Sequence, residues 1–117
     1  MIVFPGAIRI FLYRGATDMR KSFDGLSGLV RTHFRENVLS GSLFVFVNRR
    51  LTYTKILYWD GDGFAIWAKR LERGTFRLPA SDVERVELSP PELSMLLEGI
   101  IPARISRRYR RPAAANG

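Results

Sequence analysis

The segment that most constrains the fold is "TYTKILYWDGDGFAIWAKRL", at positions 52–71. Its two halves are rich in β-branched and aromatic residues, a composition that favours strands. Between them lies Asp60-Gly61-Asp62-Gly63. An Asp-Gly pair favours a hairpin turn, because glycine accepts a positive φ and aspartate hydrogen-bonds the turn. Strands joined by so short a connection must pair antiparallel. The sequence therefore predicts a β-hairpin, over 52–60 and 63–71, in which Asp60, Gly61, Asp62 and Gly63 form a structural turn.

The two aspartates of this turn also have a second interpretation, a divalent-metal site for phosphoryl transfer. Such a site needs carboxylates that converge on Mg²⁺ from different elements, and Glu72 is the candidate third ligand. The strand patterns on both sides favour the turn, so a metal-dependent nuclease is the less favoured alternative. His33 is the single histidine, and no nucleophile motif accompanies it. We expect no catalytic residues, no metal and no cofactor.

Segments on either side of the hairpin predict further elements. Alternating apolar residues predict a strand over 7–13. Apolar residues at steps of three and four predict a helix over 17–34, which Thr17 or Asp18 caps. A nearly continuous apolar run predicts a buried strand over 40–50. The weaker strand candidates are 74–79 and 83–88.

The last predicted element is a helix over 89–100. Ser89, Pro90 and Glu92 carry the signature of a capping box with proline in the first turn, and Gly99 is placed to end the helix. The whole pattern predicts a single α+β domain, with a mostly antiparallel, curved sheet of about five or six strands and two packed helices.

Charge is distributed unevenly along the 117 residues. The net charge is +8, there is no cysteine, and no acidic residue follows Glu98. We expect a folded domain over 1–101 and a basic, flexible tail over 102–117. No targeting segment and no run long enough to span a bilayer is visible, so a cytoplasmic protein with no membrane partner is expected. Concentrated arginine favours a polyanionic partner, most commonly nucleic acid.

Basic residues cluster at the ends of the predicted hairpin and in the tail. Tyr53, Tyr58, Trp59 and Trp67 lie among them, and we interpret these four aromatics as part of the sheet core rather than as base-stacking platforms. The residues predicted to contact phosphates are Arg20, Lys21, Arg49, Arg50, Lys55, Lys69, Arg70 and Arg73, with Arg107, Arg108, Arg110 and Arg111 as an auxiliary arm.

Four blocks together carry a family resemblance: "GATDMRKSFDGLSGLV" (15–30), "GSLFVFVNRR" (41–50), "KILYWDGDGFAIWAKRLERGTF" (55–76) and "LSMLLEGI" (93–100). They resemble the accessory protein TnpB of the IS66 family of bacterial insertion sequences. Ser22 departs from the family pattern, in which glycine is more usual, and the connection "VNRRLTYTK" is a less glycine-rich variant. The arginine tail lies outside the resemblance.

The resemblance implies a non-catalytic protein that assists a separate transposase in transposition. It implies no established catalytic residues. DNA and the transposase of the same element are the expected partners, and the oligomeric state stays open. The alternative is a purely protein-binding subunit, which docks on the transposase through its sheet or through the helix over 93–100.

Overall fold

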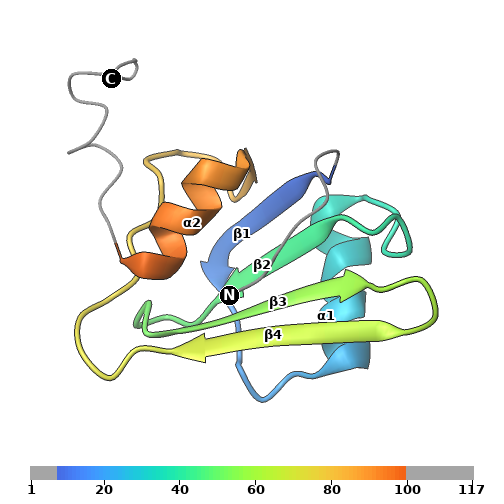
Figure 1. Cartoon of the computed structure of the whole chain (residues 1–117), viewed down its shortest axis with the longest axis horizontal. Helices are drawn as coiled ribbons and strands as arrows, with labels where there is room; N and C mark the ends of the chain where they lie inside the picture. The colour runs from blue at the N-terminus through green and yellow to red at the C-terminus, as the bar shows by residue number, and fades with distance from the viewer. Residues whose placement is uncertain (1–7, 100–117) are drawn as a thin grey trace.

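The computed structural model describes residues 8–99, which form a five-stranded sheet with helices on both faces (Figure 1). Three of the four neighbouring strand pairs are antiparallel, which confirms the predicted α+β domain with a mostly antiparallel sheet. The sheet order is β4-β3-β2-β1-β5. The strands are β1 (Ile10–Ala16), β2 (Leu43–Val47), β3 (Tyr53–Trp59), β4 (Phe64–Arg70) and β5 (Arg85–Leu88). The helices are α1 (Phe23–Leu29), the π-helical turn η1 (Val30–Phe34) and α2 (Pro90–Glu98).

The parallel pair, β1 with β2, lies at the centre of the topology. The chain leaves β1, crosses one face of the sheet through α1 and η1, and enters β2 from the same end at which β1 began (Figure 1). A parallel pair requires such a crossover connection. The other side of β1 pairs antiparallel with β5, with Ile10 opposite Leu88. Strands far apart in the sequence therefore meet at β1.

Each face of the sheet has its own core because side chains alternate along a strand. On the α2 face the buried residues include Ile10, Leu12 and Ile56 from the sheet and Leu93 and Leu96 from α2. The α1 face buries a phenylalanine-rich cluster, with members from β1, β2 and η1: Phe11, Phe34, Phe44 and Phe46. The short sheet is thus covered on both sides.

The first helix begins later than the sequence predicts, at Phe23 instead of position 17. The N–H of Thr17 donates to the carbonyl of Val47 (2.8 Å), so the chain there still follows the sheet. Asp18 accepts the backbone N–H of Arg20 (2.9 Å) within the loop and caps no helix. The prediction that Thr17 or Asp18 caps the first turn is therefore wrong, and Ser22 precedes the helix without a side-chain cap.

Two strand predictions also need correction. The first strand spans Ile10–Ala16 rather than 7–13, and Gly15 lies within it, against the ring of Tyr13. Segment 74–79 forms no strand. Instead Phe76 is buried in the α2-face core, and its N–H donates to the carbonyl of Leu51 (2.7 Å). The segment is apolar because this one ring is buried in the core, and it does not pair with a strand. The strand prediction for 74–79 is therefore wrong.

The hairpin and the second helix form as predicted. β3 pairs with β4 over seven residues without a bulge. Ser89 and Glu92 form both bonds of the capping box, and Gly99 ends α2 at φ 77°. None of the helices between residues 8 and 99 is long and apolar enough to cross a membrane.

Candidate nucleic-acid interface

The eight cations predicted in the body of the domain come from three segments that meet at one end of the sheet. The bond from Thr17 to Val47 brings the loop after β1 beside the turn after β2. The N–H of Leu71 donates to the carbonyl of Thr52 (2.7 Å), which brings the end of β4 beside the start of β3. We call this the basic end, and it consists of Arg20, Lys21, Arg49, Arg50, Lys55, Lys69, Arg70 and Arg73.

Carboxylates accompany two of the arginines of the basic end. Nη2 of Arg20 lies 2.7 Å from Oδ2 of Asp18. Side-chain hydrogen bonds from Arg20, followed by its backbone N–H, lower the pKa of Asp18 to about 2. Arg70 is more loosely paired, with Nε 3.8 Å from Oε2 of Glu72. Ligand phosphates would have to compete with these carboxylates for both guanidinium groups.

The two lysines within the strands make contacts that stabilise the fold. Nζ of Lys55 donates to the carbonyl of Lys21 (2.9 Å) and so anchors the loop before α1. Nζ of Lys69 donates to the carbonyl of Leu97 (2.8 Å) in the last turn of α2. A cation at a helix C-terminus satisfies a free carbonyl and complements the helix dipole. Sequence reasoning assigned both lysines to phosphate contacts and missed these bonds.

Arg49 and Arg50 are exposed at the tip of the turn that joins β2 to β3. The turn is built around Asn48, whose Oδ1 accepts the N–H groups of Thr52 (2.9 Å) and Tyr53 (3.1 Å). Nδ2 of Asn48 donates to Oγ1 of Thr52 (3.1 Å). Backbone bonds from Asn48 to Tyr53 (3.0 Å) and from Leu51 to Asn48 (3.1 Å) hold the same turn. The Asn48 side chain thus reinforces a turn that presents the two arginines to solvent. Sequence reasoning did not single out Asn48, although asparagine is a typical turn residue.

The four aromatic residues of the hairpin differ in position. Tyr58 and Trp67 pack against the α2-face core. Trp59 stands edge-on to Phe64, with ring centroids 5.1 Å apart. Tyr53 lies at the basic end, where Nζ of Lys55 is 6.0 Å from its ring centroid. All four are half-buried, so three of them support the hairpin and one also borders the basic end.

The Asp60–Gly63 turn lies at the opposite end of the β3–β4 hairpin (Figure 1). The N–H of Asp60 donates to the carbonyl of Gly63 (2.8 Å), and Gly61 takes φ 86°. Glu72 follows the other end of β4, and the strand between them, Phe64–Arg70, alone spans about 20 Å. The three carboxylates of the nuclease alternative are thus not brought together. Residues 8–99 hold no group of three side chains placed to bind a metal ion.

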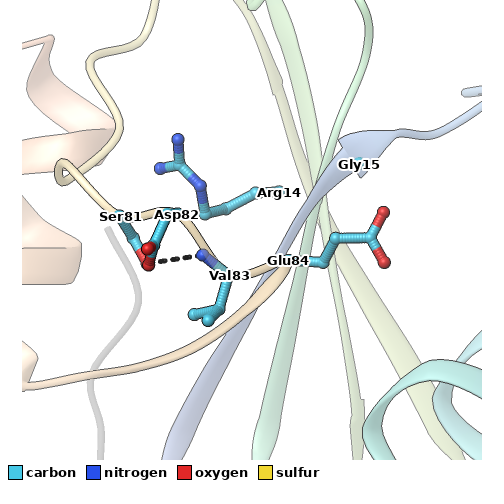
Figure 2. Close-up of a pocket in the computed structure, with 6 residues that line it drawn as sticks. All are labelled: Arg14, Gly15, Ser81, Asp82, Val83 and Glu84. Atoms are coloured by element: carbon cyan, nitrogen blue, oxygen red, sulfur yellow. Dashed lines mark hydrogen bonds between the residues drawn. The ribbon is translucent and has the colours of Figure 1, made fainter.

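A shallow hollow lies beside the basic end, between β1 and the segment that leads to β5 (Figure 2). Arg14 and Glu84 line it from opposite sides and are joined by a backbone bond of 2.6 Å. The guanidinium of Arg14 donates to the carbonyl of Pro79, and Oγ of Ser81 accepts the N–H of Val83 (3.2 Å). The bonds from Arg14 to Pro79 and Glu84 thus attach the irregular segment before β5 to the sheet.

The predicted auxiliary arm, Arg107, Arg108, Arg110 and Arg111, lies outside the described residues. The described chain ends at Gly99, directly after the α2 turn that Lys69 contacts. The last described residue, Gly99, therefore lies two residues beyond the carbonyl that Lys69 of the basic end contacts.

Comparison with known proteins places these features in a family. The family described as IS66 Orf2 like protein matches residues 8–107, most of the chain. The chain belongs to the IS66 Orf2-like family. This membership confirms the resemblance to IS66 accessory proteins that the sequence blocks carry. It also assigns the chain to a family of transposition accessory proteins that is not a known enzyme family.

Two relatives of this IS66 Orf2-like protein come from Sinorhizobium fredii (strain NBRC 101917 / NGR234). The uncharacterized protein y4hO is 39% identical over 93 residues, which cover 80% of this chain and 81% of the relative. The uncharacterized protein y4jC is 32% identical over 106 residues, which cover 90% of this chain and 91% of the relative. No solved structure matches the chain.

Proposed function

We propose that this IS66 Orf2-like protein is a non-catalytic accessory protein of transposition that binds DNA phosphates through the basic end of its sheet. The observation that carries the proposal is the exposed Arg49–Arg50 pair at the tip of a turn held by Asn48. Arginine forks match phosphate geometry and are the usual residues for such contacts. A preformed turn presents them without further ordering of the backbone, which lowers the cost of binding.

The surroundings of this turn support a phosphate surface rather than a site for one small anion. Eight cations gather there, and the carboxylates paired with them are Asp18 and Glu72. Positive charge spread over three segments suits a backbone that carries one charge every few ångströms. Contacts to phosphate alone position a protein without reading sequence, so binding is expected to depend weakly on base sequence.

The tail adds a second part to the proposal. Residues 102–117 contain five arginines, and Leu97, near the end of the described chain, accepts a hydrogen bond from Lys69 of the basic end. If all five contact phosphate, they contribute about −4.5 to the slope of log K against log salt concentration. Deletion of residues 102–117 is then expected to flatten that slope by about this amount. An unchanged slope would remove the tail from the interface.

The turn itself is tested by binding of a fluorescent random-sequence duplex to the full chain at several salt concentrations. Arg49→Ala with Arg50→Ala is expected to reduce the slope by about 2, because two phosphate contacts are lost. The matched control is Arg31→Ala with Arg35→Gly, which removes two exposed charges beyond α1. Glycine suits the φ of 55° at Arg35. Equal slopes for both variants would contradict a localised interface.

In the purely protein-binding alternative, the protein docks on the transposase through its sheet or through α2. Leu93 and Leu96 are fully buried against the protein's own sheet, so the apolar face of α2 is occupied. Retention of the transposase of the same element after nuclease treatment, without any shift of duplex DNA at low salt, would favour this alternative over DNA binding.

A further inference from the structure

The two edges of the sheet differ in how open they are to another strand. Within residues 8–99, β4 and β5 each have a strand neighbour on one side only. β5 has four residues, two of them exposed and charged, Arg85 and Glu87. β4 has seven residues, pairs with β3 without a bulge, contains no proline and begins with the apolar run Phe64–Trp67. Edges that remain unpaired are usually short, charged or interrupted, and β4 is none of these over its first four residues.

The hydrogen bonds at the two ends of the hairpin show which groups of β4 face outward. The carbonyl of Gly63 accepts the N–H of Asp60, and the N–H of Leu71 donates to Thr52, so positions 63 and 71 bond toward β3. Bonding alternates with a period of two along an antiparallel strand. The N–H and C=O groups of Phe64, Ile66, Ala68 and Arg70 therefore point toward the open side of the sheet.

β4 also runs from negative to positive charge. The turn before it carries Asp60 and Asp62, while Arg70 ends the strand and Arg73 follows it. An antiparallel copy of the same strand reverses this order and brings unlike charges together. A register centred on Ile66 sets Phe64 opposite Ala68, and Asp62 opposite Arg70, of the second copy. By twofold symmetry each of these pairs occurs twice.

The helix that covers this part of the sheet begins with an exposed apolar residue. α1 contacts β3 and β4, and its N-terminal end lies behind β4 (Figure 1). Phe23, the first residue of α1, is 44% exposed. A twofold axis through the β4 edge places both α1 helices on the same face of the joined sheet.

We propose that the β4 edge binds the β4 edge of a second copy of this chain, antiparallel about a twofold axis, so that one sheet continues across both copies. This homodimer goes beyond DNA binding and is not required by it. Arg49 and Arg50 lie in the turn before β3, one strand in from the edge, and stay available for phosphate in the dimer.

The hydrogen-bonding part of the proposal is tested by light scattering on the full chain over a wide concentration range. The wild type is expected to reach twice the mass of one chain. Ala68→Pro removes an outward N–H at an exposed position and leaves the β3 ladder in place, so it is expected to be monomeric. Ala68→Thr keeps the N–H and is the control that stays dimeric. Circular dichroism checks that each variant is folded.

The charge part is tested by exchange. Asp62→Arg and Arg70→Asp each place like charges opposite one another and are expected to raise the dimer dissociation constant about tenfold or more. The chain with both substitutions restores unlike pairs and is expected to recover dimerisation. This rescue keeps the test decisive even if Ala68→Pro fails to fold.

Two results would overturn the homodimer. One is a wild-type chain that is monomeric at every concentration. This result would overturn the homodimer even if the β4 edge bound the transposase instead. The other is a dimer that neither Ala68→Pro nor the single charge changes weaken. Duplex binding by Ala68→Pro, whose substituted residue lies outside the basic end, separates this proposal from the proposed function. If Ala68→Pro is monomeric and keeps its affinity for duplex DNA, neither proposal is contradicted. If the wild type is a dimer that does not bind duplex DNA, only the proposed DNA binding is contradicted.

Discussion

The two turns that bracket β3 have opposite charges, and both contain backbone hydrogen bonds, which a side chain supplements in the basic turn after β2. In the turn after β2, the Asn48 side chain makes three hydrogen bonds, and Leu51 takes a left-handed φ of 59°. In the turn after β3, a backbone bond and Gly61 are sufficient. The basic turn is thus reinforced by a side chain and places a non-glycine residue, Leu51, at an unfavourable positive φ. In the acidic turn, the residue with positive φ is a glycine, which adopts it without strain. Residues held at an unfavourable φ are common where a turn must keep functional side chains in place.

The largest expected effect comes from removal of the side chain that holds the basic turn. Asn48→Ala loses three part-buried hydrogen bonds and is expected to lower the free energy of unfolding by about 2–3 kcal/mol. Asp62→Ala in the acidic turn has no such role and is expected to cost less than about 0.5 kcal/mol. Urea denaturation of both variants measures the difference, and equal losses would remove the contrast between the two turns.

Gly61→Ala tests whether the acidic turn requires a glycine at its position of positive φ. An added Cβ meets no atom within 4 Å, so any loss arises from the φ of 86° alone. We expect a loss of about 1 kcal/mol in the free energy of unfolding. Gly63→Ala is the matched control, since its Cβ is equally free and its φ is not in the left-handed region. A tolerated Gly61→Ala would show that this turn is not fixed by glycine.

Gly28→Ala serves as a reference outside both turns and has the opposite sign. Gly28 lies within α1, and an added Cβ there meets nothing within 4 Å. Alanine is the better helix former, so thermal and urea unfolding should show a gain of about 0.5–1 kcal/mol. A loss of stability would mean that the helix needs glycine for a contact that the structure does not show.

The Asp18–Arg20 pair predicts a small pH dependence at the basic end. The pKa of Asp18 falls from its ordinary 3.8 to about 2 in the folded chain, so the stabilisation is present above about pH 4 and is lost as pH falls toward 2. Asp18→Asn removes this contribution. Unfolding of the wild type should therefore become easier across that window, and the variant should show less of this change. Parallel curves for both proteins would contradict the pair's role.

Local signals predicted much of this fold. The β3–β4 hairpin follows from two strand patterns and an Asp-Gly turn, and α2 follows from its capping box and Gly99. The pairing of β1 with β5 was beyond such reasoning, because Ile10 and Leu88 share no local pattern. The late start of α1 was missed for the same reason, since a bond to Val47 keeps Thr17 with the sheet.

The candidate site shows the same division between local and long-range information. The sequence indicated that six of the eight cations lie near the ends of the hairpin, whereas Arg20 and Lys21 were expected on the polar side of the first helix. The structure brings the segments that carry all eight to one end of the sheet. The sequence did not indicate that Lys55 and Lys69 donate to backbone carbonyls of Lys21 and Leu97, because these bonds join segments 34 and 28 residues apart. Composition identifies candidate ligands for phosphate, and only the packing shows which of them already have partners.

The most direct test of the central claim compares the two turns in one experiment, an NMR titration of the full chain with a short random-sequence duplex at low salt. The account predicts amide shift changes concentrated in the turn after β2, around Arg49 and Arg50, and in the adjoining loops after β1 and β4, with little change at Asp60–Gly63. Changes centred on the acidic turn, or no change anywhere at saturating duplex, would contradict it.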